Sequence, residues 1–411
     1  MLQVPKSRQT IWSLRGVYDE AILLSILNFN LFFSSTSTLH VQFHFLLLAL
    51  VKLYPKLFQN YSMKYKIKSA ILLLLVFSLN AQSQTKDELL NYLKSLGHGK
   101  YLFGQQATWV HNENPDMDNP SNWLKKVYDN TGIMPRYGCT TYDFEGNPFT
   151  DTEWNEGVKK IWERGLIPGV YNYWANPSGA GRRGQVQIDP VFATDDNPVK
   201  ANFYKQMDRM VANMQWLKDN GITVVYTPFV ELDDRNKWHA KEGSKNGIRL
   251  YRLVHDYFTS KGLDNIVWAF HTRQVPGALA EYYPGDEYVD VIGKSGYGAG
   301  LDFNEYEWAV EKKKNAGKVI WWAELGIRGK SESPVDCLNV LAKLENSYPE
   351  LAGFSFWSDD GFYNVVGNNN GRELMSSQKI VTMNSSDKIK KIPMKKTKKD
   401  NTRKKSDKSK P

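Results

Sequence analysis

The sequence predicts an α/β fold, a (β/α)8 TIM barrel, over residues 85–384 of the 411-residue chain. Eight short apolar runs of β-rich composition alternate with stretches whose apolar residues recur at helical spacing. Several of the runs are almost continuously apolar, as strands of a parallel sheet covered by helices must be. Strand and helix alternating eight times is typical of a closed barrel rather than of an open sheet.

The expected strands cover residues 101–106, 133–143, 166–174, 223–232, 265–273, 289–297, 318–326 and 351–358. The clearest helical stretches between them cover residues 154–164, 202–220, 248–261, 305–316 and 335–347. Hydrophobic residues make up 41% of the chain and charged residues 24%. This composition allows a large core and excludes disorder for most of the chain.

The run from Met63 to Gln84 has a basic start, an apolar stretch and an exit of small residues. These are the three parts of a secretory signal peptide, so we expect residues 63–84 to be one and the protein to be secreted, in the periplasm or at the cell surface. Residues 1–62 are then interpreted as an over-extended gene-model segment. The alternative is a membrane hairpin or anchor, because two apolar stretches occur there in tandem.

The basic residues are concentrated at the ends of the chain, whose formal net charge is +9. Residues 385–411 hold 12 Lys or Arg and 3 Asp, and we expect this basic tail to be disordered and solvated. The alternative is that it contacts an anionic polymer at the cell surface. Residues 85–386 hold 33 basic and 39 acidic residues, and this mildly acidic body predicts no nucleic-acid partner.

The cysteines and histidines predict neither a disulfide framework nor a metal site. The chain has two cysteines, Cys139 and Cys337, far apart in the sequence. We expect both to be small core residues, because free cysteine is among the most buried residue types. The histidines lack zinc-type spacing, so we expect no metal.

Aromatic, acidic and amide side chains stand where the predicted strands end. In a TIM barrel the active site lies at these C-terminal strand ends. Aromatic rings stack on the apolar face of a sugar, and acids and amides hydrogen-bond its hydroxyl groups. The sequence therefore predicts a carbohydrate site, with Gln106, Asp143, Trp174 and Arg273 among its substrate-binding residues.

Two acids stand out, because each ends an otherwise apolar run. Glu231 ends the fourth run and Glu324 lies near the end of the seventh, and strands four and seven face each other across the barrel mouth. Retaining glycoside hydrolysis uses such a carboxyl pair, about 5–5.5 Å apart. We therefore predict that they are the catalytic pair. The alternative is that each glutamate pairs with an Arg or Lys at the barrel rim.

At these residues the segment 101–381 resembles glycoside hydrolase family 26, the β-mannanase family of a (β/α)8 clan. The similar stretches are 103–106, 262–268, 288–293, 321–326 and 354–358. The resemblance implies that Glu231 is the acid/base and Glu324 the nucleophile. It also implies that Tyr297 hydrogen-bonds the nucleophile and that Trp357 is a platform under the sugar. Trp238 matches a tryptophan in the family's loop after strand four.

Two positions depart from the family pattern. Val230 replaces the histidine that usually precedes the acid/base, and Ala175 replaces the histidine that usually follows the tryptophan at the end of strand three. Both histidines normally help to hold the sugar at the cleavage point, so their loss indicates a different sugar or linkage. It also leaves Asp233 or Asp234 as an alternative acid/base.

We therefore expect a monomeric, retaining endo-β-glycanase that cleaves β-1,4-mannosidic linkages in mannan-type polysaccharides. Two carboxylates suffice for this chemistry, so no cofactor is expected. One alternative is a related enzyme acting on β-1,3-xylan or mixed-linkage glucan. Another is a barrel that binds carbohydrate without catalysis. A contact with the membrane is expected only through the signal peptide or surface attachment.

Overall fold

The computed structural model describes residues 85–383, apart from 109–112, 147, 299, 330–331 and 359–360. The expected segment 1–62, the signal peptide 63–84 and the basic tail 385–411 lie outside this part of the chain and stay predictions. No helix in the described part is both long and apolar enough to cross a membrane.

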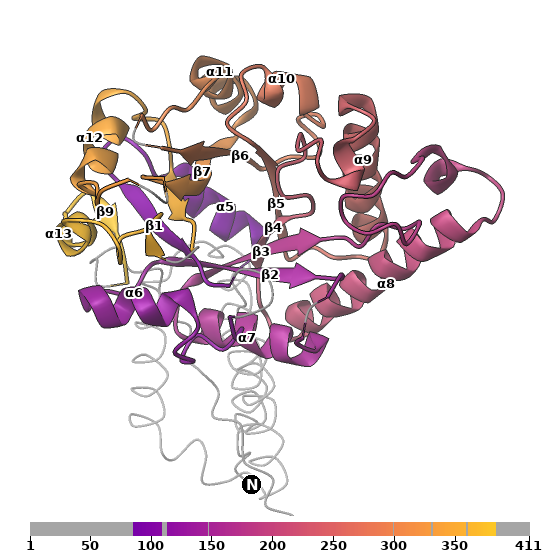
Figure 1. Ribbon diagram of the computed structural model, residues 1–411, viewed down its shortest axis with the longest axis horizontal. Coiled ribbons are helices and arrows are strands. Elements are labelled where there is room, and N and C mark those ends of the chain that lie inside the picture. Colours follow the sequence, from indigo (N-terminus) through magenta and orange to yellow (C-terminus); the bar gives the residue numbers. More distant parts are fainter. Residues whose placement is uncertain are drawn as a thin grey trace, which may run out of the picture. The chain divides into compact units, whose positions relative to one another are not determined.

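Eight parallel strands form a closed barrel at the centre of the domain (Figure 1). Neighbouring strands follow sequence order from β2 to β8 and then β1, and β1 also pairs with β2, which closes the barrel. The predicted (β/α)8 fold is confirmed. The strands are β1 (Tyr101–Gln106), β2 (Tyr137–Asp143), β3 (Ile167–Tyr173), β4 (Val224–Thr227), β5 (Ile266–Thr272), β6 (Val291–Tyr297), β7 (Val319–Gly326) and β8 (Gly353–Phe356), with a short β9 (Ile380–Val381) beside β1.

Helices surround the strands (Figure 1). They are α5 (Lys86–Lys94), α6 (Trp123–Thr131), α7 (Asp151–Glu163), α8 (Pro198–Asp219), α9 (Ser244–Ser260), α10 (Ala278–Tyr282), α11 (Tyr306–Ala316), α12 (Leu338–Asn346) and α13 (Gly371–Ser376), with 3-10 turns η1 (Asp189–Phe192) and η2 (Trp238–Ala240). The five helices expected from the sequence are confirmed as α7, α8, α9, α11 and α12. The sequence patterns did not predict α5, α6, α10, α13 or β9, which are nine residues or shorter.

Local signals set the bounds of several helices. Thr85 and Thr150 begin α5 and α7 with capping boxes, in which the threonine hydroxyl and a glutamate three residues later satisfy exposed backbone N–H groups. Gly132 and Gly317 end α6 and α11 in the left-handed conformation, with φ of 71° and 64°.

The hydrophobic core has an outer and an inner layer. The outer layer lies between strands and helices and includes Phe203 and Trp268. The inner layer fills the barrel, and its residues Val225 and Val291 stand at the starts of their strands. Leucines of α5, including Leu93, belong to the inner layer, so α5 closes the N-terminal end of the barrel. The opposite end, where the strands finish, is not covered by α5 and is where a TIM barrel carries its active site.

Both cysteines are core residues, as expected. Cys139 and Cys337 are unpaired and fully buried. Cys139 lies in the inner layer and Cys337 in the outer layer.

Because Leu93 of α5 is 2% exposed, Leu93→Ala should leave a cavity beneath the barrel. We expect a loss of about 2–5 kcal/mol in the free energy of unfolding, measured by chemical denaturation. Leu338→Ala is the matched control, because Leu338 is 37% exposed on α12 and should change stability by about 0.5 kcal/mol or less. Equal effects of the two substitutions would show that α5 does not seal the barrel.

Candidate active site

Glu231 lies in a tight turn beyond the end of β4. The sequence predicted a strand reaching residue 232, but β4 ends at Thr227, so this boundary was wrong. The turn gives Glu231 a φ of 52°, a conformation that costs a non-glycine residue free energy and is often found at functional sites. The backbone N–H of Leu232 donates to the carbonyl oxygen of His271 at 2.9 Å. The end of β5 therefore holds the turn in place.

Glu324 lies within β7, and its side chain is aimed by an irregularity in the strand. The pairing of β7 with β8 shifts register between Trp322 and Leu325, and such irregularities re-aim side chains at barrel rims. The hydroxyl of Tyr171 donates to the carbonyl oxygen of Ala323 at 2.8 Å. The hydroxyl of Tyr297 donates to Oε2 of Glu324 at 2.9 Å. Glu324 is therefore fixed through both its backbone and its carboxylate.

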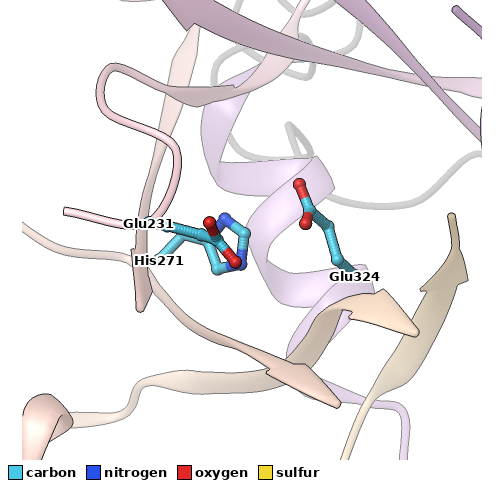
Figure 2. A group of neighbouring side chains, drawn as sticks. All are labelled: Glu231, His271 and Glu324. Carbon is cyan, nitrogen blue, oxygen red and sulfur yellow. The ribbon is translucent and has the colours of Figure 1, made fainter. Parts of the chain in front are cut away.

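The two carboxylates approach each other closely (Figure 2). One oxygen of Glu231, one oxygen of Glu324 and a ring nitrogen of His271 all lie within 4.8 Å of one another. Glu324 is 4% exposed and Glu231 is half-buried. The structure thus brings together the two predicted glutamates from opposite sides of the barrel mouth.

Burial, followed by the negative charge of Glu231, raises the pKa of Glu324 to about 8. Lys237 and the hydrogen bond from Tyr297 oppose this shift. Nζ of Lys237 lies 3.4 Å from Oε2 of Glu231, so an ammonium group faces the second carboxyl group of the pair. Glu324 therefore keeps its proton to a higher pH than an exposed glutamate does.

Ser295 and His271 lie beside Oε1 of Glu231, whereas Lys237 lies beside Oε2. The Ser295 hydroxyl is 3.0 Å from Oε1 of Glu231 and 2.9 Å from Nε2 of His271. Burial, followed by the charges of Lys237 and Lys294, holds the pKa of His271 well below its usual value. The imidazole is therefore neutral at neutral pH.

Glu231, His271 and Glu324 are the group in the described part of the chain with the atom types and spacing of a metal site. All three already have other partners. The Ser295 hydroxyl is hydrogen-bonded to both Glu231 and His271, and the ammonium group of Lys237 lies beside Glu231. The Tyr297 hydroxyl donates to Glu324. Because a metal would have to displace these contacts, the arrangement suits two catalytic carboxyl groups better than a metal.

Asp233 and Asp234, the alternative acids, are bound to Arg273. The backbone N–H of Arg273 donates to Asp233 Oδ1 at 2.7 Å. The Arg273 guanidinium lies 3.6 Å from Asp233 and 3.5 Å from Asp234. The two aspartates are therefore engaged in ion pairs, and Arg273 supports the loop that carries Glu231; its predicted contact with substrate stays a prediction.

Gln106 and Asp143, two further predicted contacts, are buried and bonded within the protein. Nε2 of Gln106 donates to the Thr141 hydroxyl at 2.9 Å and to the carbonyl oxygen of Thr108 at 3.1 Å. Asp143 is paired with Arg182, with Nη2 and Oδ2 2.5 Å apart. As placed, both side chains hold neighbouring strand ends and loops together.

Of the predicted aromatic platforms, Trp174 and Trp238 lie in the core. They are 3% and 1% exposed. The indole N–H of Trp174 donates to the carbonyl oxygen of Pro228, and that of Trp238 to the carbonyl oxygen of Trp174. Both rings are covered by protein in this structure, and their predicted contact with substrate stays a prediction. Trp357, directly after β8, is also largely buried, at 8% exposed.

Lys237, which lies beside Glu231, also faces the ring of Tyr173 together with Arg182, and the sequence did not assign these three residues to the site. Tyr173, the last residue of β3, is buried, and its ring is faced by Arg182 at 5.0 Å and by Lys237 at 5.1 Å. Tyr173 stands at a strand end, which could have identified it. Arg182 and Lys237 come from loops without a regular pattern, so no sequence signal pointed to them.

Comparison with known protein families also indicates a glycoside hydrolase. The model of the family described as glycosyl hydrolase family 26 matches residues 78–385. The chain belongs to this family. It is therefore a glycoside hydrolase with a TIM barrel.

Characterised relatives are distant in sequence. A mannan endo-1,4-β-mannosidase of Bacillus subtilis is 26% identical over 306 residues, covering 68% of this chain and 81% of the relative. The mannan endo-1,4-β-mannosidase A and B of Caldalkalibacillus mannanilyticus is 23% identical over 252 residues, covering 58% of this chain. The match spans 45% of that relative's own length.

Solved structures show the same fold. The structure of the Bacillus subtilis mannanase man26 has a TM-score of 0.63 at 16% identity, covering 76% of this chain and 98% of that one. GH26A from Muricauda sp. MAR_2010_75 has a TM-score of 0.59 at 20% identity, covering 74% and 97%.

The raised pKa of Glu324 predicts a stability cost that depends on pH. A carboxyl group that binds its proton more tightly in the folded state lowers stability as pH rises from its unfolded pKa to its folded pKa. That window runs from 4.5 to about 8. Glu324→Gln should therefore gain stability over the native protein as pH rises from 5 to 8.5, by about 1.4 kcal/mol per unit of pKa shift.

Chemical denaturation of both proteins at pH 5, 7 and 8.5 measures this difference. Glu156→Gln, at an exposed glutamate on α7, controls for the loss of a negative charge. A difference between Glu324→Gln and the native protein that does not change with pH would contradict the raised pKa.

Proposed function

We propose that the protein is a retaining endo-β-1,4-mannanase. The observation that carries the proposal is the pair Glu231 and Glu324, whose nearest oxygens lie within 4.8 Å. Retaining glycosidases hold their two carboxyl groups about 5–5.5 Å apart, whereas inverting enzymes separate them by about 6.5–9.5 Å to admit a water molecule. The curated relatives named as mannan endo-1,4-β-mannosidases support the choice of substrate.

In this mechanism Glu324 is the nucleophile and Glu231 the acid/base. The Glu324 carboxylate attacks the anomeric carbon while the bond from that carbon to the glycosidic oxygen breaks, and Glu231 gives its proton to the departing oxygen. Glu231, now a carboxylate, then takes a proton from water, and the water oxygen displaces Glu324 from the sugar. The Tyr297 hydroxyl, 2.9 Å from Glu324, orients the nucleophile.

The electrostatics of the free site supply the single proton that this cycle needs. Close, buried carboxyl groups share one proton over a wide range of pH. The reactive form has that proton on Glu231 and a charged carboxylate on Glu324. Activity should fall as pH rises through about 8, when the proton is lost.

A second candidate substrate is another β-linked polymer, such as β-1,3-xylan or mixed-linkage glucan. The region around Ala175 favours it. The backbone of Ala175 is already hydrogen-bonded within the protein: its N–H donates to Oε1 of Gln206 at 2.8 Å, and its carbonyl oxygen accepts from Nε2 of Gln206 at 3.1 Å. With alanine here and Val230 before Glu231, two family histidines that hold the sugar are replaced by apolar side chains.

The proposal extends to location and assembly. The signal-like segment 63–84 supports secretion, to the periplasm, the cell surface or the medium, where polysaccharide substrates are found. We propose a monomer acting on the polymer directly.

Reducing-sugar release from mannan, β-1,3-xylan, mixed-linkage glucan and cellulose tests the function. We expect release of oligosaccharides from mannan, with the β-anomer formed first by ¹H NMR. Glu324→Gln should lower the rate about a thousandfold or more, whereas Glu156→Gln on α7 should not change it. Release from xylan or glucan alone would replace the substrate, and no release from any polymer would overturn the proposal.

Tyr297→Phe tests the support of the nucleophile. A hydrogen bond to a charged group is worth about 1.5–3 kcal/mol, so kcat/KM should fall about 10- to 150-fold. Because the hydrogen bond lowers the pKa of Glu324, the basic limb of the pH profile should move to higher pH. Tyr128→Phe, at an exposed tyrosine, is the control. An unchanged basic limb would contradict this role.

A further inference from the structure

Ser295 and His271 form a short hydrogen-bonded chain that ends on Glu231. Ser295 is fully buried on β6 and His271 is 1% exposed on β5. The Ser295 hydroxyl lies 3.0 Å from Oε1 of Glu231 and 2.9 Å from Nε2 of His271. The chain thus reaches Glu231 from two strands that neither of the catalytic glutamates occupies.

Counting donors fixes the direction of this chain. A carboxylate oxygen only accepts hydrogen bonds, so the Ser295 hydroxyl donates its single hydrogen to Oε1 of Glu231. The hydroxyl must then accept from His271, which carries its proton on Nε2. Nδ1 of His271 has no hydrogen-bond partner and is buried. An unpaired acceptor there agrees with a neutral ring protonated at Nε2.

The direction has a consequence for Glu231. While His271 keeps its proton on Nε2, the Ser295 hydroxyl accepts from His271 and donates to Oε1, so the proton of the protonated Glu231 carboxyl lies on Oε2. Oε2 is also the oxygen that lies 3.4 Å from Nζ of Lys237. When Oε2 gives up its proton, the ammonium group is in place to stabilise the carboxylate that forms.

The backbone reinforces the same connection. The carbonyl oxygen of His271 accepts from the N–H of Leu232, the residue after Glu231. His271 therefore holds the strained turn through its main chain and holds the Glu231 side chain through Ser295. Val230, the preceding residue, has an apolar side chain that cannot supply such a bond.

We propose that Ser295 and His271 are positioning residues that orient Glu231 and select Oε2 as its acidic oxygen. This inference rests on the proposed function, in which Glu231 is the acid/base. A positioning role of this kind acts on proton transfer to the leaving group. It should matter only for substrates whose leaving group needs that proton.

The test compares kcat/KM for two substrates, 2,4-dinitrophenyl β-mannobioside and mannopentaose. Dinitrophenolate leaves without acid assistance, whereas a sugar does not. We expect Ser295→Ala to lower kcat/KM about 10- to 100-fold on mannopentaose and less than about threefold on the dinitrophenyl substrate. His271→Phe should show the same selective loss.

Conservative variants and a matched control separate this role from a structural one. Ser295→Thr keeps the hydroxyl and His271→Gln keeps a donor N–H, so both should restore most of the activity on mannopentaose. Ser355→Ala is the control, because Ser355 is also a buried serine on a barrel strand but its hydroxyl has no hydrogen-bond partner. It should leave the ratio of the two substrates unchanged.

Glu231→Ala separates failure of this inference from failure of the proposed function. If Glu231 is the acid/base, this variant keeps activity on the dinitrophenyl substrate and is accelerated by azide, with formation of a β-glycosyl azide. When that holds, equal losses on both substrates in Ser295→Ala, or no loss on either, overturn the positioning role alone. Absence of both azide rescue and leaving-group selectivity in Glu231→Ala overturns the acid/base assignment itself.

Discussion

Two carboxyl groups with oxygens within 4.8 Å of each other repel strongly when both are charged, and burial removes the water that would screen them. The neighbouring groups Tyr297 and Lys237 oppose this repulsion, because each stabilises negative charge on the pair. Burial and the negative charge of Glu231 raise the pKa of Glu324, which lies deeper in the barrel, to about 8. Glu231, nearer the solvent, has Lys237 beside it. The proposed mechanism needs one proton on this pair, and at the moment of attack that proton is on Glu231.

The barrel supplies the rigidity that keeps the pair together. Glu231 has a left-handed backbone that costs free energy, and Glu324 follows a register shift in β7. Both features persist because neighbouring strands hold them. The His271 carbonyl binds the turn and the Tyr171 hydroxyl binds the Ala323 carbonyl. A well-packed core, closed at its far end by α5, offsets the cost of these local strains.

The side chains that support the proposed carboxylate pair come from several elements of the barrel. Apolar residues stand at positions 175 and 230, and polar support for Glu231 comes instead from β5, β6 and the loop that carries Lys237. In the proposed mechanism the pair breaks the glycosidic bond, so the residues around it can differ without a change in the chemistry.

The sequence by itself determined the order of strands and helices and the two glutamates at the barrel mouth. Apolar periodicity reports which face of an element is buried, and alternation of elements reports the fold, so both can be read locally. The end of β4 could not be predicted from the sequence, because the apolar run Phe229-Val230 is buried in a turn rather than in a strand. Only the tertiary structure decided which side chains meet. Trp174 and Trp238 lie in the core, and Arg273 is paired with two aspartates. Ser295, His271 and Lys237 lie around Glu231. Such partners come from strands and loops that are adjacent in space but far apart along the chain, so the sequence does not show them.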